Sequence, residues 1–377
     1  MKSNWQTKQF IDCIDNVIYT SKIQRKNFLY EGNYPIVSQE YNLINGYWDN
    51  ASDLFRINRP VIIFGDHTKA LKYIDFDFVL GADGVKILQP KEFLVPRFFY
   101  YQLQSVHLDS LGYARHYKLL KELEIGYPEI SEQQQIVKVL DRILEKMVKA
   151  KENAEKNLQN ARDLFESYLQ SIFNNPGDGW EIKKLGEVYD VRDGTHDSPK
   201  YHNEGFPLIT SKNLKNDLLT FKNVQYISDE DYIKINERSK VDRGDVLFAM
   251  IGTIGNPVVV EVDPIFAIKN VALFKIPKNQ SNYFLKYYLD SKLVIEKMSD
   301  ESKGATQKFV GLGYLRNFII SIPSFPEQQN IVAKLDALSA ETKKLETIYQ
   351  QKLNDLEELK KSILQKAFKG ELTGGCS

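Results

Sequence analysis

Apolar residues recur at intervals of three and four over two long stretches of the chain. In the first stretch, 131–173, they form a seam with one slip, and neither Pro nor Gly interrupts it. Such a seam is typical of a helix that pairs with another helix along its length. About 43 residues at a rise of 1.5 Å each make a helix of roughly 65 Å. The seam positions are Ile136, Leu140, Ile143, Met147, Ala150, Ala154, Leu158, Ala161, Phe165, Tyr168 and Ile172.

The second stretch repeats the first without a gap. PEISEQQQIVKVLD begins at Pro128, and PSFPEQQNIVAKLD begins 195 residues later at Pro323. An apolar seam of this length needs a partner of equal length, and the repeat supplies one. We therefore predict that the two helices pair antiparallel as a rigid spacer. Identical residues continue downstream at the same offset, where Leu158, Leu164, Ser167, Leu169, Gln170 and Phe173 fall on Leu353, Leu359, Ser362, Leu364, Gln365 and Phe368.

Short β-type runs separated by turn residues precede each long helix. They are 61–64, 76–80, 85–88, 245–250, 258–262 and 271–276, while 96–108 and 283–297 are more helical. The pattern predicts an α+β chain in which two mixed α/β domains are separated by two long α-helices, paired as an antiparallel coiled coil with a pseudo-twofold internal repeat. The predicted boundaries are 1–127 and 176–322 for the domains, and 128–175 and 323–377 for the helices.

Composition and charge narrow the possible functions. The 377 residues carry 50 Lys and Arg against 50 Asp and Glu, so the formal net charge is zero. This balance excludes a protein that binds nucleic acid through bulk positive charge. Cys13 and Cys376 lie near opposite ends, so we expect neither a disulfide framework nor a paired-cysteine zinc site. No apolar run reaches the roughly 18 residues of a membrane span, and we expect a cytoplasmic protein without membrane contact.

Motifs for catalysis are missing from the sequence. The nearest approach to the (N/D)PP(Y/F) loop of an amino-methyltransferase is Asp263-Pro264-Ile265-Phe266, which lacks the second proline. No GxxxxGK(S/T) motif is present, and the histidines have no metal-site spacing. Asp178, Glu181 and Lys183 lie too close in sequence for the usual arrangement of a metal-dependent nuclease. We predict no catalytic residue and no metal ligand in this chain.

With the repeat and its EQQxIVxxLD core established, the chain resembles the specificity (S) subunit of type I restriction-modification enzymes. The resemblance covers essentially the whole length. It rests on Glu132-Gln133-Gln134 with Leu140-Asp141, Glu327-Gln328-Gln329 with Leu335-Asp336, the closing KAFKGEL from Lys366, and Trp180 with Leu185-Gly186-Glu187. The first domain departs from the pattern, since Phe10-Ile11 stands where the second domain has Leu185-Gly186.

The resemblance implies a non-catalytic subunit of a prokaryotic complex. Each domain would recognise one half of a bipartite, asymmetric double-stranded DNA target. Two methyltransferase subunits and two restriction subunits would dock on the chain, and S-adenosylmethionine, ATP and Mg²⁺ would belong to those partners. The residues expected in the coiled coil and in partner docking are Glu132, Gln133, Gln134, Ile136, Leu140, Glu327, Gln328, Gln329, Ile331 and Leu335.

Polar loops beside turn residues are the candidates for reading base edges. Asn and Gln suit adenine, and Arg and Lys suit guanine. In the first domain the candidates are Gln39, Asn42, His67, Thr68, Lys69, Arg115, His116 and Lys118. In the second domain they are Arg192, Thr195, His196, Lys200, Ser211, Lys212, Asn213, Thr306, Gln307 and Lys308.

Two other classes of function stay open at this point. The chain could be a structural coiled-coil adaptor that binds proteins only, in which case a reconstituted complex would not protect DNA selectively. It could also be an enzyme with a cryptic methyltransferase or nuclease site, in which case the purified chain alone would transfer methyl groups or cut DNA.

Overall fold

The computed structural model describes residues 5–112, 114–302, 309–369 and 371. The chain divides into two compact units, which are considered one at a time. The first unit runs to Glu155 and resumes at Gln351, and the second unit is Lys156–Gln350. Each unit therefore holds one mixed domain and part of each long helix. No helix in the described ranges has the length and apolarity that crossing a bilayer would require.

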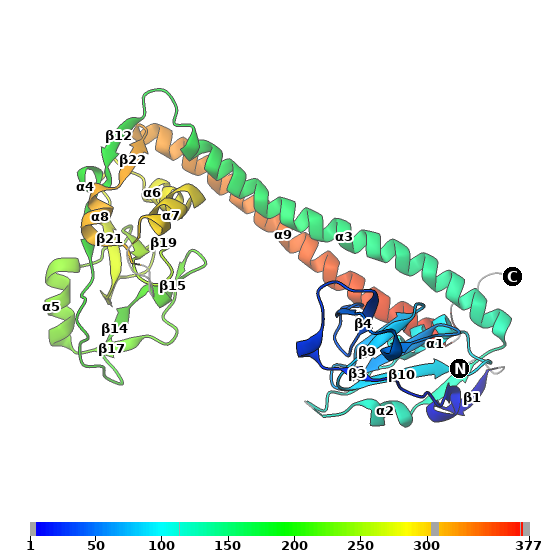
Figure 1. Cartoon of the computed structure of the whole chain (residues 1–377). Coiled ribbons are helices and arrows are strands. Elements are labelled where there is room, and N and C mark those ends of the chain that lie inside the picture. Colours follow the sequence, from blue (N-terminus) through cyan, green and yellow to red (C-terminus); the bar gives the residue numbers. More distant parts are fainter. Residues whose placement is uncertain (1–4, 113, 303–308, 370, 372–377) are drawn as a thin grey trace. The chain divides into compact units, whose positions relative to one another are not determined.

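The two predicted long helices are confirmed. Helix α3 is Ile130–Asn174, with 45 residues, and helix α9 is Phe325–Phe368, with 44 residues (Figure 1). In the first unit, the early part of α3 lies beside the late part of α9, where Lys151 Nζ pairs with Glu357 Oε1 at 2.9 Å. In the second unit, the late part of α3 lies beside the early part of α9, where Arg162 Nε pairs with Glu346 Oε2 at 3.2 Å. Within each unit the pairing is antiparallel.

These two ion pairs occupy equivalent positions in the internal repeat, with the positive and negative residues exchanged between the helices. The 195-residue offset maps Lys151 onto Glu346 and Arg162 onto Glu357. Each copy keeps opposite signs across the helices although the sign on each helix has changed. Both pairs are well exposed, so each contributes only about 0.2–1 kcal/mol. We attribute to them a role in helix register, while the apolar seam provides the stability.

The first domain consists mainly of short strands. Strand β1 pairs antiparallel with β11, one sheet has the order β2-β10-β7-β8, and a second has the order β3-β9-β4-β5 with β6 beside β9. The elements are β1 (Gln6–Gln9), β2 (Ile14–Asp15), β3 (Lys22–Ile23), β4 (Tyr34–Val37), β5 (Gly46–Trp48), β6 (Leu54–Phe55), β7 (Val61–Gly65), β8 (Leu71–Ile74), β9 (Phe78–Gly81), β10 (Val85–Pro90), α1 (Pro96–Ser105), α2 (Tyr117–Lys121) and β11 (Glu124–Tyr127).

The second domain follows the same plan. Strand β12 pairs antiparallel with β22, and the sheets have the orders β13-β21-β18-β19, β17-β14-β20 and β15-β16. The elements are β12 (Glu181–Lys184), α4 (Leu185–Val188), β13 (Asp190–Asp193), β14 (Phe206–Ile209), β15 (Leu214–Lys215), β16 (Leu218–Leu219), β17 (Gln225–Ile227), α5 (Asp229–Ser239), β18 (Val246–Ala249), β19 (Gly255–Val259), β20 (Ala267–Ile268), β21 (Val271–Lys275), α6 (Asn282–Asp290), α7 (Lys292–Asp300), α8 (Leu312–Asn317) and β22 (Ile319–Ile322).

The duplication extends to topology. Both domains contain a four-stranded antiparallel sheet and a parallel strand pair, β4 with β9 and β14 with β20. Phe10 stands where the second domain has Leu185, but the backbone hydrogen bond at this position is the same in both domains. The Phe10 N–H donates to Leu123 O at 2.9 Å, and the Leu185 N–H donates to Phe318 O at 2.9 Å. The second domain adds the β15–β16 hairpin, which lies in sequence between the paired strands β14 and β17. Asn216 and Asp217 form the tip of this hairpin, and both have positive φ.

One of the local predictions needs correction. The strand predicted at 258–262 is β19, which begins at Gly255 and ends at Val259 and whose pairing with β18 shifts register between Leu247 and Ala249. The helical character predicted at 283–297 is confirmed, and it belongs to two helices, α6 and α7. Ser291 separates them with an extended backbone, and its hydroxyl donates to Tyr288 O at 2.7 Å. The other five predicted strands are confirmed within a few residues.

The core of each domain continues into the helices. In the first unit, Ile136 and Leu140 of α3 pack with Leu364 and Ala367 of α9 against the domain. In the second unit, Ile331 and Leu335 of α9 pack with Leu169 and Phe173 of α3. Fully burying such a side chain contributes about 1.5–3 kcal/mol. The repeated apolar positions therefore join helix and domain as well as helix and helix.

Candidate functional site

In the first domain, several predicted residues gather where parallel strands β4 and β9 end. The turn after β7 contacts the segment after β4: the Thr68 hydroxyl donates to Gln39 O at 2.5 Å, and the His67 N–H donates to Gln39 Oε1 at 3.3 Å. Because the carboxyl ends of parallel strands meet at one edge, loops distant in sequence come together there. Tyr41 adds to this contact, since its hydroxyl donates to Thr68 O at 2.9 Å.

His116 holds this loop cluster from inside. It is 1% exposed, its Nδ1 lies 3.0 Å from Asp66 O, and its Nε2 accepts the Leu111 N–H at 3.1 Å. The Asp66 carboxylate accepts the Tyr117 N–H at 2.8 Å. His116 therefore positions the loops and does not present its ring to solvent.

The remaining candidates of the first domain differ in exposure. Lys69 is half-buried with φ 61°, and its ammonium donates to Leu108 O at 3.2 Å. Asn42, Arg115 and Lys118 are exposed around the cluster. These three side chains are available for contact with a ligand.

In the second domain, the equivalent edge carries a hydrogen-bonded network. His196 Nδ1 lies 2.8 Å from Asn270 Oδ1, and His196 Nε2 lies 2.9 Å from Asp193 Oδ2. The nearly buried Asp193 carboxylate also pairs with Arg238. Both ring nitrogens face acceptor oxygens, so these hydrogen bonds to Asn270 and Asp193 raise the pKa of His196 above its ordinary value.

The second domain also separates internal from exposed candidates. Asn213 is 4% exposed, its Oδ1 accepts the Thr210 N–H at 3.0 Å, and its amide donates to Thr220 O at 3.0 Å. It shapes its turn and presents no free amide. The other placements are Thr195, half-buried after β13, Arg192, paired with Asp190 at 2.6 Å, Ser211, which donates to Asn270 O at 3.3 Å, and Lys200 and Lys212, both exposed. Thr306, Gln307 and Lys308 lie outside the described residues.

Asp66 and Asp193 lie within loops that the sequence singled out, whereas Arg238 and Asn270 were missed. Asn270 has φ 54°, a conformation that Asn tolerates better than most residues. An Asn directly before the apolar run of β21 was therefore a signal in the sequence for a turn at this position. Arg238 carried no such signal, because it lies on α5, 45 residues from the carboxylate that it meets.

A second site, the junction between each long helix and its domain, is built from the EQQ motif. Gln133 is 0% exposed: its amide donates to Phe93 O and Pro128 O, both at 2.8 Å, and its Oε1 accepts the Val95 N–H at 2.8 Å. Gln328, also 0% exposed, donates to Pro323 O at 3.0 Å and accepts the Ser281 N–H at 2.9 Å. The middle glutamine therefore performs the same task in both copies.

The neighbours of these glutamines are duplicated too. Trp5 donates to Glu132 at 3.4 Å, and Trp180 donates to Glu327 at 2.9 Å. The aromatic contacts Trp5–Phe98–Phe368 recur as Trp180–Phe284–Phe173. The first residue of each motif, Glu132 or Glu327, is half-buried, whereas the third residue, Gln134 or Gln329, faces solvent.

A tyrosine and an aspartate complete each junction. Tyr101 donates to Asp141 Oδ1 at 2.5 Å, and Tyr287 donates to Asp336 Oδ1 at 2.5 Å. Burial, and then the hydrogen bond to Asp141, raises the pKa of Tyr101 to about 12. Both hydroxyls therefore act as donors that hold the aspartates in place.

Comparison with known families settles what this duplicated architecture is. The model of the type I restriction modification DNA specificity domain matches residues 2–158 and again 177–358. The chain belongs to this family. The two matches place one target recognition domain in each half of the chain. Within the described ranges, no group of three His, Cys, Asp or Glu residues is arranged to hold a metal ion.

Relatives in the family resemble the chain over most of its length. The specificity subunit of the type I restriction enzyme MjaVIII from Methanocaldococcus jannaschii is 23% identical, covering 91% of this chain and 87% of the relative. The EcoR124I/EcoR124II specificity subunit from Escherichia coli is 25% identical, covering 80% of this chain and 78% of the relative.

Solved structures share the fold. A chain from a study of complex assembly and conformational transition of the type I R-M system superposes with a TM-score of 0.72, at 20% identity and 98% coverage of both chains. The HsdS subunit from Thermoanaerobacter tengcongensis gives a TM-score of 0.58, at 18% identity and the same coverage.

Proposed function

We propose that this chain is the DNA-specificity subunit of a type I restriction-modification complex and that it reads a bipartite, asymmetric double-stranded target. The observation that carries the proposal is a duplicated set of loops: in each family domain, loops come together at the ends of a parallel strand pair, β4 with β9 and β14 with β20. One half-site belongs to each domain, and the continuous helices separate the two halves by a spacer of indifferent sequence.

Contacts to the bases come from the exposed candidates whose side-chain polar groups have no hydrogen-bond partner among the described residues, which leaves out His196 because both its ring nitrogens are bonded. In the first domain these are Asn42, Arg115 and Lys118, and in the second domain Lys200 and Lys212. The hydrogen-bonded members, such as Gln39 and His116, hold the loops in position. Amide and cationic side chains are those that discriminate base edges in the major groove.

The chain itself performs no chemical step in this proposal. Two methyltransferase subunits bind S-adenosylmethionine and modify the target, and two restriction subunits use ATP and Mg²⁺. These partners dock on the helices and junctions, where Gln134 and Gln329 are the exposed members of the EQQ motifs. Gln133 and Gln328, the buried residues of the two motifs, hold each long helix on its target recognition domain.

Methylome sequencing of cells that carry this chain with its methyltransferase tests the proposal. A two-part asymmetric motif is expected, and Arg115→Ala should relax the half read by the first domain while the other half is unchanged. Lys212→Ala should do the reverse. A complex that assembles but leaves every sequence unmethylated, or methylates without preference, would favour a protein-binding adaptor. Methyl transfer by the purified chain alone would favour the enzyme.

A further inference from the structure

The two junctions differ at one place, although their frameworks are duplicated. In the first unit, the Arg97 guanidinium donates its Nε–H to Asp141 Oδ1 at 2.8 Å. The same guanidinium lies over the rings of Tyr73 and Tyr101, at 5.2 Å and 5.7 Å. Asp141 thus binds an arginine that also stacks on aromatic faces, an arrangement that Lys does not reproduce.

The second unit keeps the aspartate and the tyrosine, but among its described residues no arginine stands in this place. Because Tyr287 matches Tyr101, the position of Arg97 is taken by Tyr283, whose hydroxyl turns to Glu261. Tyr73 lies opposite Ile62 in its sheet, and the matching strand position, opposite Val246, is Val259. The Arg97 guanidinium is therefore replaced by a tyrosine that bonds to Glu261, and the Tyr73 ring is replaced by the smaller side chain of Val259.

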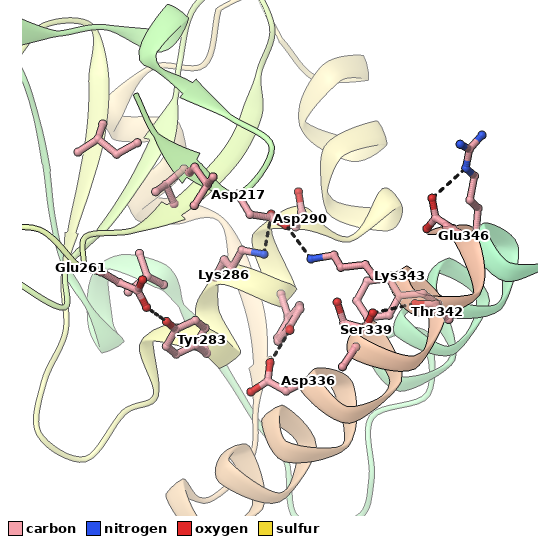
Figure 2. Close-up of a pocket in the computed structure, with 18 of the residues that line it drawn as sticks. Asp217, Glu261, Tyr283, Lys286, Asp290, Asp336, Ser339, Thr342, Lys343 and Glu346 are labelled. Atoms are coloured by element: carbon pink, nitrogen blue, oxygen red, sulfur yellow. Dashed lines mark hydrogen bonds and ion pairs between the residues drawn. The ribbon is translucent and has the colours of Figure 1, made fainter. Parts of the chain in front are cut away.

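A pocket of about 640 Å³ lies at this place in the second unit (Figure 2). Asp336 of α9 and Tyr283 and Tyr287 of α6 line it, together with apolar side chains such as Val258 and Val259. Its lining includes five carboxylates and three cationic side chains, so its formal charge is −2. DNA phosphates are repelled by such a lining, whereas a cationic side chain is attracted.

The cations already present do not neutralise Asp336. Arg162 is paired with Glu346 at 3.2 Å, and Lys343 lies 3.9 Å from Asp217. The nearly buried Lys286 is paired with Asp217 at 2.7 Å and lies over the Tyr287 ring at 4.9 Å. In the part of the chain that the structure describes, Asp336 has no ion-pair partner. Every arginine of the sequence falls within that part, so an arginine bound to Asp336 would come from another molecule.

We infer that this pocket receives an arginine side chain of the methyltransferase subunit, bound by the Asp336 carboxylate as Arg97 is bound by Asp141 in the first unit. The inference rests on the proposed function and names a docking site within it. The apolar lining accommodates the residues that flank the arginine on its own segment. The first unit fills the equivalent place with its own arginine, so the two junctions offer different surfaces to a partner.

Affinity for the methyltransferase tests the inference in the full chain. Asp336→Asn removes the charge but keeps an acceptor for Tyr287, and Tyr283→Arg supplies an internal guanidinium as in the first unit. Each variant should weaken binding at least tenfold, because an arginine would be left without its carboxylate or would face another cation. Glu341→Gln removes an exposed carboxylate from the same helix outside the pocket and serves as the matched control.

A photo-cross-linking amino acid at Ala340, which lines the pocket, identifies the occupant. The expected product is a methyltransferase peptide that contains arginine. Replacing that arginine by Ala together with Asp336→Asn should weaken binding no more than either change alone, a result that general destabilisation does not produce. Additive losses, a cross-linked peptide without arginine, or wild-type affinity of both pocket variants would overturn the inference. Failure of the wild-type chain to assemble or to direct methylation would instead overturn the proposed function.

Discussion

The buried glutamines at the helix junctions offer the sharpest test of how the domains are held. In Gln133→Leu, the Val95 N–H, the Phe93 carbonyl and the Pro128 carbonyl each lose a partner at 2.8 Å. A buried polar group left without a partner costs about 1–3 kcal/mol. Because the buried leucine regains about 1.5–3 kcal/mol, we expect a net loss of about 1.5–6 kcal/mol in local stability.

The second junction should respond less. In Gln328→Leu, the Ser281 N–H and the Pro323 carbonyl lose their partners, but the third partner is the Gln280 side chain, which can turn to solvent. We expect roughly two-thirds of the loss at the first junction. Gln134→Leu changes a solvent-facing neighbour in the same motif and provides the control.

Hydrogen exchange followed by mass spectrometry measures these losses locally, which matters in a chain with two units. A loss of about 3 kcal/mol corresponds to exchange faster by a factor on the order of 100 in the peptides around 93–103 and 130–140. Acceleration below tenfold in both leucine variants would refute the view that these amides hold helix to domain. Equal acceleration in Gln134→Leu would refute it as well.

Four further predictions follow from the helices, the loops and the charge. Inserting four residues within 145–160 adds about 6 Å of helix, which at about 3.4 Å per base pair lengthens the unread spacer by one or two base pairs; an unchanged spacer in the methylome would contradict this. Leu140→Asp with Leu335→Asp should disrupt helix pairing because both side chains are buried, as measured by loss of helical circular dichroism, and a normally assembling variant would count against the coiled coil. The raised pKa of His196 means that its protonated form stabilises the second domain fully below its ordinary pKa of 6.5 and that this contribution is lost as pH rises through the folded value. The loop's protection factor, which is its exchange rate relative to the intrinsic rate at the same pH, should therefore be larger at pH 6 than at pH 8 in wild type and similar at both in His196→Gln. The neutral chain alone should bind DNA weakly and gain tight binding only with the methyltransferase, so nanomolar binding by the isolated chain at physiological salt would contradict the expectation.

The long helices and the duplication were predictable because their information is local or periodic. Spacing of three and four residues specifies a helix wherever it occurs, and an offset of 195 residues is visible without knowledge of any contact. The central strands were predictable for the same reason, since each is a short apolar run between turns. The bounds of β19 and the break at Ser291 were not visible in the sequence, because the first lies where the pairing register shifts and the second is one residue with an extended backbone.

The roles of the site residues depended on tertiary structure. The sequence marked Gln133 and His116 as candidates, but their hydrogen-bond partners lie about 40 and 50 residues away, so only folding shows that they hold loops and do not face a ligand. The same holds for the pocket beside Asp336. Its motif shares the EQQxIVxxLD core with the motif around Asp141, and the difference between a filled and an open site arises from residues on a separate helix and strand. Periodicity determines which elements form, whereas the partner of a polar side chain is determined by which elements the fold brings together.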